Sequence, residues 1–461
     1  SSNQLRELPD SITRLQNLSE LDLSFNQLSE LPDSITRLQN LSVLNLSSNQ
    51  LSELPDSITR LHNLSWLDLD NNPLVKPPIE TASRGIEAIR EYFRDIAEGE
   101  DTLYEAKLII VGEGGAGKTT LARKILDADA PMPKPEETTK GIDVLEWHFS
   151  MENGQDFRVN IWDFGGQEIY HNTHRYFLTK RSLYLLVADS RKGNPQLDYW
   201  LNIIELLSDN SPLIIIKNEV ENRTVAINEA PLRERFANLQ NKNLATNLGN
   251  PQGGSGLETI KKAIKYHISE LPHIGTSLAK TWIKVRNALE QSDQNYISLD
   301  DYFRICEQNG YQRRADSETD NRLILSQYFH DLGVILHFQD NQTSPLYETV
   351  ILKPKWGTDA AYKVLDNLQV KQNLGKFTTA DLNHIWQDAE YQNMQAELLE
   401  LMQEFKLCYP LPNDKNTYTY IAPQLLEDEQ AKYPWDTANN LLLRYEYDFM
   451  PRGILSRFIV E

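Results

Sequence analysis

The chain has 461 residues, 66 of them acidic and 46 basic, and its formal net charge of -20 argues against nucleic acid or an anionic membrane as the main partner. Cys306 and Cys408 are too few and too far apart for a disulfide framework or a metal-ligand cluster, which fits a reducing, cytoplasmic setting. No apolar run is long enough to span a bilayer, so we expect a multidomain protein without an integral membrane segment.

A repeat occupies the first part of the chain. The pattern Leu-x-x-Leu-x-Leu-x-x-Asn recurs at residues 18–26, 41–49 and 64–72, which is typical of leucine-rich repeats. Its alternating leucines predict one short strand per repeat, and each asparagine can bond backbone groups at the following turn. We therefore expect a leucine-rich-repeat solenoid over residues 1–80, which serves either as a concave surface for an unknown protein partner or as a spacer or autoinhibitory cover.

The segment after the repeats has the pattern of an amphipathic helix. Its apolar residues Ile86, Ile89 and Phe93 fall near helical spacing, and they predict one helix over residues 81–98. That helix lies inside a linker over residues 81–103. We expect it to cap the last repeat and to couple the repeats to the domain that follows.

The next segment carries the pattern G-x-x-x-x-G-K-[ST], which is typical of the phosphate-binding loop of nucleotide triphosphatases. It stands between an apolar strand over residues 106–111 and the start of a helix, a context in which backbone N–H groups surround phosphate oxygens. Lys118 would reach the β- and γ-phosphates and act in catalysis, and the Thr119 hydroxyl would ligate Mg²⁺. The nucleotide-binding residues expected here are Gly112, Glu113, Gly114, Gly115, Ala116, Gly117, Lys118, Thr119 and Thr120.

Two further loops would report whether the γ-phosphate is present. Asp163 would hold a Mg²⁺-bound water, Gly166 would present its N–H to the γ-phosphate, and Gln167 would orient the attacking water as a catalytic residue. A threonine between the two motifs can ligate Mg²⁺ only while the γ-phosphate closes its loop, and Thr139 is preferred to Thr138 for this role. The expected metal ligands are Thr119, Thr139 and Asp163.

These motifs resemble those of small GTP-binding proteins of the Ras and Rab type. With the repeats before them and the segments after them, the whole chain resembles the Roco family, and Ser182–Arg191 resembles the next strand of that family's GTPase domain. The resemblance implies binding of GTP and GDP with slow GTP hydrolysis, and a Ras-like P-loop α/β domain called Roc, here residues 104–271. It also implies a COR domain after Roc and a homodimer for the full-length protein.

The base-recognition loop departs from the family pattern. GTP-binding proteins usually carry Asn-Lys-x-Asp after the fifth strand, whereas this chain reads Asn218-Glu219-Val220-Glu221. Asn218 keeps its place, Glu221 stands where the aspartate would accept the guanine hydrogens, and Glu219 replaces the lysine that would cover the base. A glutamate can still accept both hydrogens, so guanine preference survives in principle, while affinity and discrimination stay open.

The last part of the chain is expected to be an α+β, winged-helix-like COR region. Helices alternate with short strands over residues 272–440, and no recognition helix gathers Lys and Arg, which favours protein contacts over DNA. Phe329–Ile335 and Leu352–Trp356 resemble the first half of COR. Residues 441–461 resemble the start of its second half, which carries much of the family's dimer contact, so we expect this truncated chain to be monomeric.

The function expected from the sequence is a GTP-binding molecular switch with slow, Mg²⁺-dependent hydrolysis, whose nucleotide state is coupled to the COR and repeat domains. Two alternatives stay open: an interaction scaffold with a structural, barely hydrolysed nucleotide, and an ATP-driven switch. No arginine finger is assigned, because Arg175, Arg181 and Arg191 each read better as surface charges.

Overall fold

The computed structural model describes two compact units. Ser1–Glu105 and Glu270–Pro354 form the first, and Ala106–Ser269 and Lys355–Glu461 form the second. The segment expected to be the first half of COR is therefore divided between the units at residue 354. The described residues are 4–134, 139, 141–152, 154–165, 182–191, 197–208, 210–220, 223–224, 227–250, 254, 256–315, 320–411 and 418–426.

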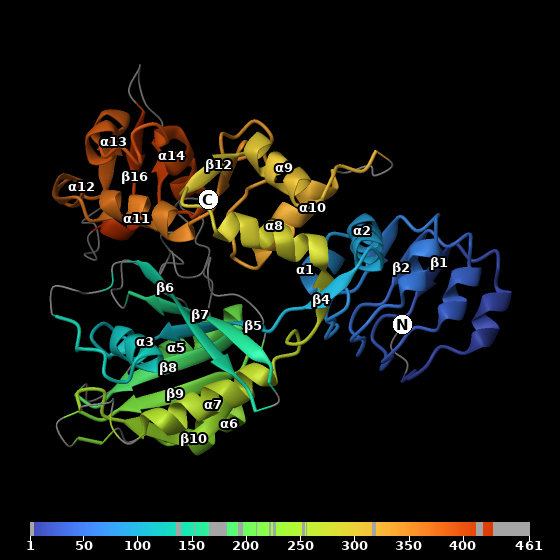
Figure 1. The fold of residues 1–461 in the computed structure, drawn as a ribbon, viewed down its shortest axis with the longest axis horizontal. Coiled ribbons are helices and arrows are strands. Elements are labelled where there is room, and N and C mark those ends of the chain that lie inside the picture. Colours follow the sequence, from blue (N-terminus) through green and yellow to red (C-terminus); the bar gives the residue numbers. More distant parts are fainter. Residues whose placement is uncertain are drawn as a thin grey trace, which may run out of the picture. The chain divides into compact units, whose positions relative to one another are not determined.

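The repeats of the first unit form a three-stranded parallel sheet (Figure 1). Its strands β1 (Glu20–Asp22), β2 (Val43–Asn45) and β3 (Trp66–Asp68) pair so that the middle leucine of each strand stands beside the next. This ladder confirms the predicted solenoid. A short 3₁₀ helix precedes each strand: η1 (Asp10–Arg14), η2 (Asp33–Arg37) and η3 (Asp56–Arg60).

The repeat asparagines bond backbone groups of two successive repeats. The side-chain nitrogen of buried Asn49 donates to Leu46 O at 2.9 Å and to Leu23 O at 3.0 Å. Its side-chain oxygen accepts from Leu28 N at 3.1 Å. Each bonded asparagine thus satisfies turn groups that would otherwise be buried without partners, as predicted.

The linker predicted to be one helix is broken into two. α1 (Ile79–Ala82) and α2 (Ile86–Ala97) are separated at Gly85, whose φ of +90° suits a residue without a Cβ. Arg90 on α2 donates to Leu61 O of the last repeat at 2.7 Å, and the apolar face of α2 shares one core with the repeats and with residues 278–352. The predicted capping of the repeats is confirmed, and α2 belongs to the first unit.

Antiparallel strand pairs and helices complete the first unit. β4 (Glu100–Thr102) pairs with β11 (Ser277–Ala279), and the Tyr92 hydroxyl of α2 donates to Ser277 O at 3.1 Å. A second antiparallel pair joins β12 (Tyr296–Ser298) and β13 (Thr349–Ile351). The remaining helices are α8 (Lys280–Glu290), α9 (Leu299–Gln308) and α10 (Asn321–Asp331).

A buried ionic cluster fastens α2 to the later part of this unit. Arg314 lies 2.7 Å from Glu91 and 2.6 Å from Asp95, two acidic residues of α2. Asp95 also accepts hydrogen bonds from Trp282 Nε1 at 2.8 Å and from the Tyr311 hydroxyl at 3.0 Å. Burial raises the pKa of Asp95 to about 6, and Arg314 opposes that shift.

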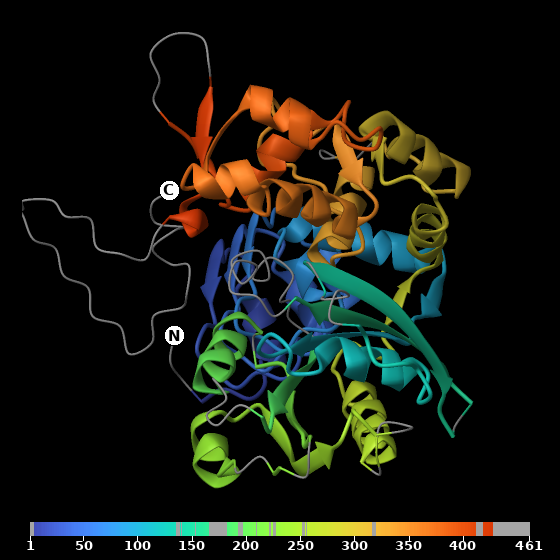
Figure 2. The ribbon, with the colours of Figure 1, turned by 90° about the vertical axis from the view of Figure 1, so that its left-hand side faces the viewer.

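A six-stranded sheet forms the centre of the second unit, in the order β10-β9-β8-β5-β7-β6. The β6–β7 hairpin is antiparallel and is the pair of long teal-green strands in Figure 2, while β5, β8, β9 and β10 pair in parallel. Ligands of open α/β sheets bind at the carboxyl ends of such parallel strands. The strands are β5 (Glu105–Val111), β6 (Ile142–Ser150), β7 (Asp156–Phe164), β8 (Ser182–Asp189), β9 (Leu213–Asn218) and β10 (Leu239–Thr246).

Four described helices accompany this sheet. α3 (Lys118–Leu126) and α7 (Leu257–Ser269) contact each other, and they contact β7 and β8 respectively. α5 (Leu197–Leu207) and α6 (Glu229–Arg235) are joined by a hydrogen bond from Arg235 to Asn202 at 2.8 Å. The apolar run of β8 is buried along its whole length, as a central parallel strand requires.

The second unit continues with a small helical and antiparallel-sheet subdomain. Three strands pair in the order β14-β16-β15, with β14 before and β15 and β16 after the last two helices. Helices combined with a small antiparallel sheet fit the predicted winged-helix-like character. Its elements are α11 (Pro354–Leu365), α12 (Leu368–Gln372), β14 (Lys376–Thr378), α13 (Thr379–Ile385), α14 (Gln395–Glu404), β15 (Tyr409–Pro410) and β16 (Thr419–Ile421).

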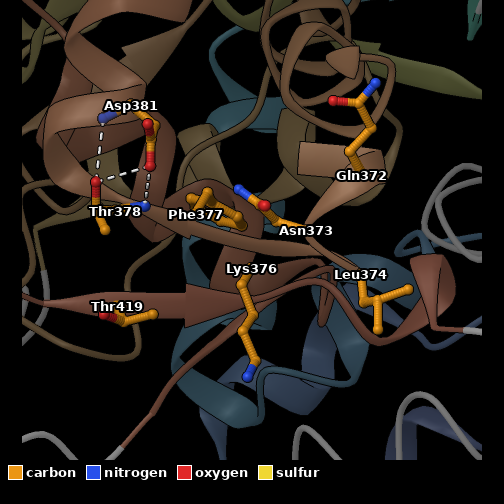
Figure 3. A pocket seen from close by; sticks show the side chains of 8 residues that line it. All are labelled: Gln372, Asn373, Leu374, Lys376, Phe377, Thr378, Asp381 and Thr419. Carbon is orange, nitrogen blue, oxygen red and sulfur yellow. Dashed lines mark hydrogen bonds between the residues drawn. The ribbon is translucent and has the colours of Figure 1, made fainter. Parts of the chain in front are cut away.

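A shallow pocket borders β14, and Figure 3 shows the side chains that line it. The backbone N–H of Thr378 donates to Asp381 Oδ2 at 2.8 Å, and the backbone N–H of Lys376 donates to Asn373 O at 3.1 Å. Both donors are therefore used locally, and they do not offer hydrogen bonds to an added strand. We assign this pocket no function.

Candidate nucleotide-binding site

The predicted phosphate loop lies between β5 and α3. The loop needs glycine at both ends because other backbones approach it closely. A Cβ at Gly112 would lie 2.6 Å from Val187 O, and one at Gly117 would lie 2.7 Å from Asn218 Nδ2. Both glycines also have positive φ, 140° and 99°. The loop can thus approach β8 and β9 only because these side chains are missing.

Lys118 lies within this loop. Its Nζ donates to Gly112 O at 2.9 Å and to Glu113 O at 2.8 Å, and the residue is buried. These carbonyl groups hold the ammonium at the concave side of the loop, where phosphate oxygens would approach it. Thr120, the next residue but one on α3, is buried.

Three oxygen-bearing side chains from different segments meet beside Lys118. Thr119 is the second residue of α3, Thr139 belongs to the loop before β6, and Asp163 lies near the end of β7. Thr119 Oγ1 is 2.5 Å from Asp163 Oδ2 and 2.7 Å from Thr139 Oγ1, and Thr139 Oγ1 is 3.0 Å from Asp163 Oδ2. The structure therefore brings all three predicted metal ligands together.

The second carboxylate oxygen of Asp163 indicates which kind of ligand this cluster can bind. Asp163 Oδ1 is buried and has no hydrogen-bond donor within the described part of the chain. Burial raises the pKa of Asp163, while the hydrogen bond from Thr119, the charge of Lys118 and the hydrogen bond from Thr139 oppose the rise. A buried carboxylate with an unsatisfied oxygen beside two hydroxyls fits a hard cation such as Mg²⁺, which prefers oxygen ligands and keeps some of its water.

This donor set is sparse for a metal site made by protein alone. No group of three or more His, Cys, Asp or Glu side chains suited to a metal occurs among the residues that the structure describes. One carboxylate and two hydroxyls would leave several positions of an octahedral Mg²⁺ to water and to phosphate oxygens. The residues present therefore fit a metal that arrives with a nucleotide.

Asn218 connects the phosphate loop to two other loops. Its side-chain nitrogen donates to Ala116 O at 3.0 Å, and its side-chain oxygen accepts from Leu248 N at 3.2 Å. The residue is buried at the end of β9. This brings the start of the predicted base-recognition loop to the phosphate loop. Gly166, Gln167 and Glu221, and the alternative switch threonine Thr138, lie outside the described residues.

Sequence reasoning missed Arg191, which it treated as a surface charge. Arg191 Nη2 donates to Gly115 O of the phosphate loop at 2.9 Å and to Asp189 Oδ2 at 2.7 Å. Its Nε also donates to Asp189 Oδ1 at 3.0 Å. The only signal in the sequence was an acidic and a basic residue two positions apart after a buried strand. Arg175 and Arg181 lie outside the described residues.

The segment after Thr139 rests on α11. Gly141 has a φ of +77°, and a Cβ there would lie 2.1 Å from a ring carbon of Tyr362. Two residues later, Asp143 pairs with Lys355 at 3.0 Å. Both contacts join β6 and the residues just before it to α11.

Comparisons with known proteins agree with this geometry. Residues 107–221 match the model described as "Ras of Complex, Roc, domain of DAPkinase", residues 279–426 match "C-terminal of Roc, COR-A domain", and residues 16–74 match "Leucine rich repeat". The solved RocCORdC structure of Methanosarcina barkeri Roco2 bound to GDP is 30% identical, with a TM-score of 0.59, and the match covers 71% of this chain and 98% of that one. The chain belongs to the Roco family. The predicted family and fold class are thereby confirmed.

Roco relatives among characterised proteins are longer. The probable serine/threonine-protein kinase pats1 of Dictyostelium discoideum is 29% identical over 84% of this chain, which spans 13% of its length. The Roc-COR-CHAT protease of Runella zeae is 28% identical over 81% of this chain, which spans 41% of its length. The domain boundaries given above stay predictions. None of the described helices of this Roco chain is long and apolar enough to cross a membrane.

Proposed function

We propose that this Roco chain is a guanine-nucleotide switch that binds GTP and GDP with Mg²⁺ and hydrolyses GTP slowly. The observation that carries the proposal is the meeting of Thr119, Thr139 and Asp163 beside Lys118, with the Asp163 Oδ1 atom buried and without a hydrogen-bond donor among the described residues. The GDP bound to the Methanosarcina barkeri relative supports the same ligand class.

The proposed chemistry is positioning and charge stabilisation. Lys118 would neutralise charge on the β- and γ-phosphates, and backbone N–H groups of the loop 112–119 would surround the phosphate oxygens. Bound Mg²⁺ would supply further positive charge to the phosphates. Thr119, Thr139 and Asp163 would hold that ion directly or through water, and Gln167 would orient the attacking water.

The switch itself would be the Thr139 loop. Thr139 can contribute to the metal site only while its loop is closed, so loss of the γ-phosphate would release it. The contacts of Gly141 with Tyr362 and of Asp143 with Lys355 support a coupling of this loop to α11. α11 follows β13 directly in the chain, and β13 belongs to the unit that contains the repeats.

A competition titration with GTP, GDP and ATP, followed by measurement of phosphate release, tests the proposal. We expect GTP and GDP to compete for one site, ATP to compete poorly, and phosphate to be released slowly. Lys118→Ala should abolish measurable binding, because the ammonium is central to the phosphate loop. Equal binding of ATP would favour an ATP-driven switch, and GTP binding without phosphate release would favour a scaffold. The homodimer of the full-length protein, a protein partner at the repeats and the cytoplasmic setting remain part of the proposal.

A further inference from the structure

The end of β8 connects the two loops that would hold opposite ends of a nucleotide. Asp189, the last residue of the strand, is buried and holds the Arg191 guanidinium through both carboxylate oxygens. The same guanidinium donates to Gly115 O in the phosphate loop. Arg191 thus has one fixed anchor and one partner in the loop that would surround the phosphates.

The residue between them joins the base-recognition loop. Ser190 N donates to Asn218 O at 3.1 Å, and Ser190 Oγ accepts from Val220 N at 2.9 Å. Arg191 therefore leaves the main chain beside the base loop and reaches the phosphate loop. The chain thus contacts the base loop at Ser190 and the phosphate loop at the next residue, Arg191.

The base-recognition loop carries Glu219 at the position where a lysine is expected. Glu219 stands where GTP-binding proteins usually carry a lysine that covers the base, and its backbone N–H donates to Thr246 O at 2.8 Å. An acidic residue in that place cannot supply a positive charge to the nucleotide. Arg191, which lies outside the phosphate loop, is a cation bonded to it.

We propose that Arg191, oriented by Asp189, supplies this nucleotide site with the cation that is missing at residue 219. It fixes the Gly115 carbonyl so that the neighbouring N–H groups of the loop stay turned toward the phosphates, and it presents a cation between the phosphate loop and the base loop. This inference rests on the proposed function, because it assigns a further residue to the same nucleotide site.

The position of the contact predicts which property depends on Arg191. Gly115 belongs to the loop that both nucleoside diphosphates and triphosphates would use, so Arg191 should act on GDP and GTP alike. A hydrogen bond to a charged group contributes more than one between neutral groups. Because the Arg191 side chain is 45% exposed, solvent weakens this contact, and we expect roughly a tenfold loss of affinity on its removal.

The experiment measures dissociation constants of the whole 461-residue chain for fluorescent N-methylanthraniloyl derivatives of GDP and of a non-hydrolysable GTP analogue. The variants are Arg191→Gln and the double variant Arg191→Gln with Glu219→Lys. Arg304→Gln is the matched control. Arg304 is 67% exposed, it pairs on the surface with Asp301, and both residues belong to the first unit, whereas the nucleotide site belongs to the second. Thermal unfolding without nucleotide shows whether each variant folds. If Arg191→Gln does not fold, Arg191→Lys replaces it with an expected two- to fivefold loss, since lysine keeps the charge but cannot bridge Asp189 and Gly115 as a planar fork does.

We expect Arg191→Gln to weaken both nucleotides roughly tenfold, Arg304→Gln to change neither, and the added Glu219→Lys to restore most of the loss. Unchanged affinity in Arg191→Gln, or slower single-turnover hydrolysis with unchanged affinity, would overturn the inference while leaving the proposed function in place. A loss that Glu219→Lys does not repair would also overturn it, because the role would then not be that of the missing lysine. Absence of nucleotide binding by the unaltered chain would overturn the proposed function and the inference together.

Discussion

The hydroxyl oxygens of Thr119 and Thr139 lie 2.7 Å apart although one is carried by the second residue of α3 and the other belongs to a loop twenty residues further along the chain. Both also lie within hydrogen-bond distance of Asp163 Oδ2. Thr119 belongs to α3 and Asp163 to β7, whereas Thr139 lies in the loop before β6. In the proposed switch, Thr139 is therefore the residue whose position would depend on the γ-phosphate.

Thr139→Val should weaken binding of a GTP analogue and leave GDP binding unchanged. The valine keeps the shape of threonine but removes the oxygen, and the oxygen is needed only when the γ-phosphate closes the loop. We expect roughly a tenfold rise in the dissociation constant for the analogue, measured by fluorescence titration with Mg²⁺. Thr138→Val is the comparison variant. If it shows the selective loss and Thr139→Val does not, the assignment of the switch threonine is wrong.

Gly141→Ala should destabilise the second unit more than Gly154→Ala does. Both glycines have φ near +80°, 77° and 81°, so an added Cβ strains both backbones by about 1 kcal/mol. At Gly141 the Cβ would also meet the Tyr362 ring, whereas nothing lies within 4 Å at Gly154. We expect about 1 kcal/mol for Gly154→Ala and at least about 2 kcal/mol for Gly141→Ala in urea unfolding.

If the two variants lose equal free energies of unfolding, Tyr362 of α11 does not pack against Gly141. The added substitution Tyr362→Ala then gives an independent check. If the ring is the obstacle, the double variant Gly141→Ala with Tyr362→Ala should be more stable than the sum of the single effects predicts.

Arg314→Met should destabilise the first unit strongly. Its side chain is 15% exposed and its partner Asp95 is fully buried, so the substitution leaves an acid in the core without its ionic partner. Breaking a buried pair in this way costs about 3–5 kcal/mol. Arg304→Met, at an exposed pair with Asp301, should cost about 0–1 kcal/mol in the same denaturant experiment. Similar small losses in both would refute the anchoring role given to Arg314.

His337 should make the first unit less stable in mild acid. Burial lowers the pKa of His337 to about 4 from an ordinary value of 6.5, and its ring bonds Ser326 Oγ at 2.9 Å and Tyr347 O at 2.9 Å. The unfolded chain therefore binds a proton below pH 6.5 that the folded chain does not bind until about pH 4. The stabilising contribution is complete above pH 6.5 and is lost as the pH falls from 6.5 toward 4.

The measurement for His337 is the free energy of unfolding between pH 7 and pH 5. Over this range the slope for the unaltered chain should exceed that for His337→Gln by up to about 1.4 kcal/mol per pH unit, the value for one proton. The exposed His62 of the repeats supplies the control, and His62→Gln should leave the slope as it is. An identical slope for His337→Gln and the unaltered chain would show that His337 is not buried in its neutral form.

Local patterns in the sequence predicted the parts of this structure that depend on neighbours along the chain. Three parts were predicted in this way: the repeats, the phosphate loop and the strand that ends near Asp163. In each of them the order and spacing of residue types along the chain indicate the backbone conformation. The break at Gly85 was missed, since the apolar residues used for the prediction, Ile86, Ile89 and Phe93, all follow it and keep helical spacing. A glycine inside an otherwise periodic segment was the only local warning.

Contacts between distant segments could not be predicted in the same way. The Arg191 guanidinium bonds a carbonyl that lies seventy-six residues earlier in the chain, and Tyr362 packs on Gly141 from a different domain of the family. Neither residue stands in a recognisable motif, so single-sequence reasoning treated Arg191 as a surface charge. The division of the COR segment between two units could not be predicted from the sequence either, because it follows from packing and not from composition.

Calorimetric titration of GTP into the unaltered chain, once with Mg²⁺ and once with a chelator, shows directly whether the Thr119–Thr139–Asp163 cluster holds a metal together with the nucleotide. We expect one site per chain and tight binding with Mg²⁺. Removal of the metal should weaken binding to the unaltered chain but not to Asp163→Asn. Binding that is indifferent to Mg²⁺, or that prefers ATP to GTP, would contradict the proposed function.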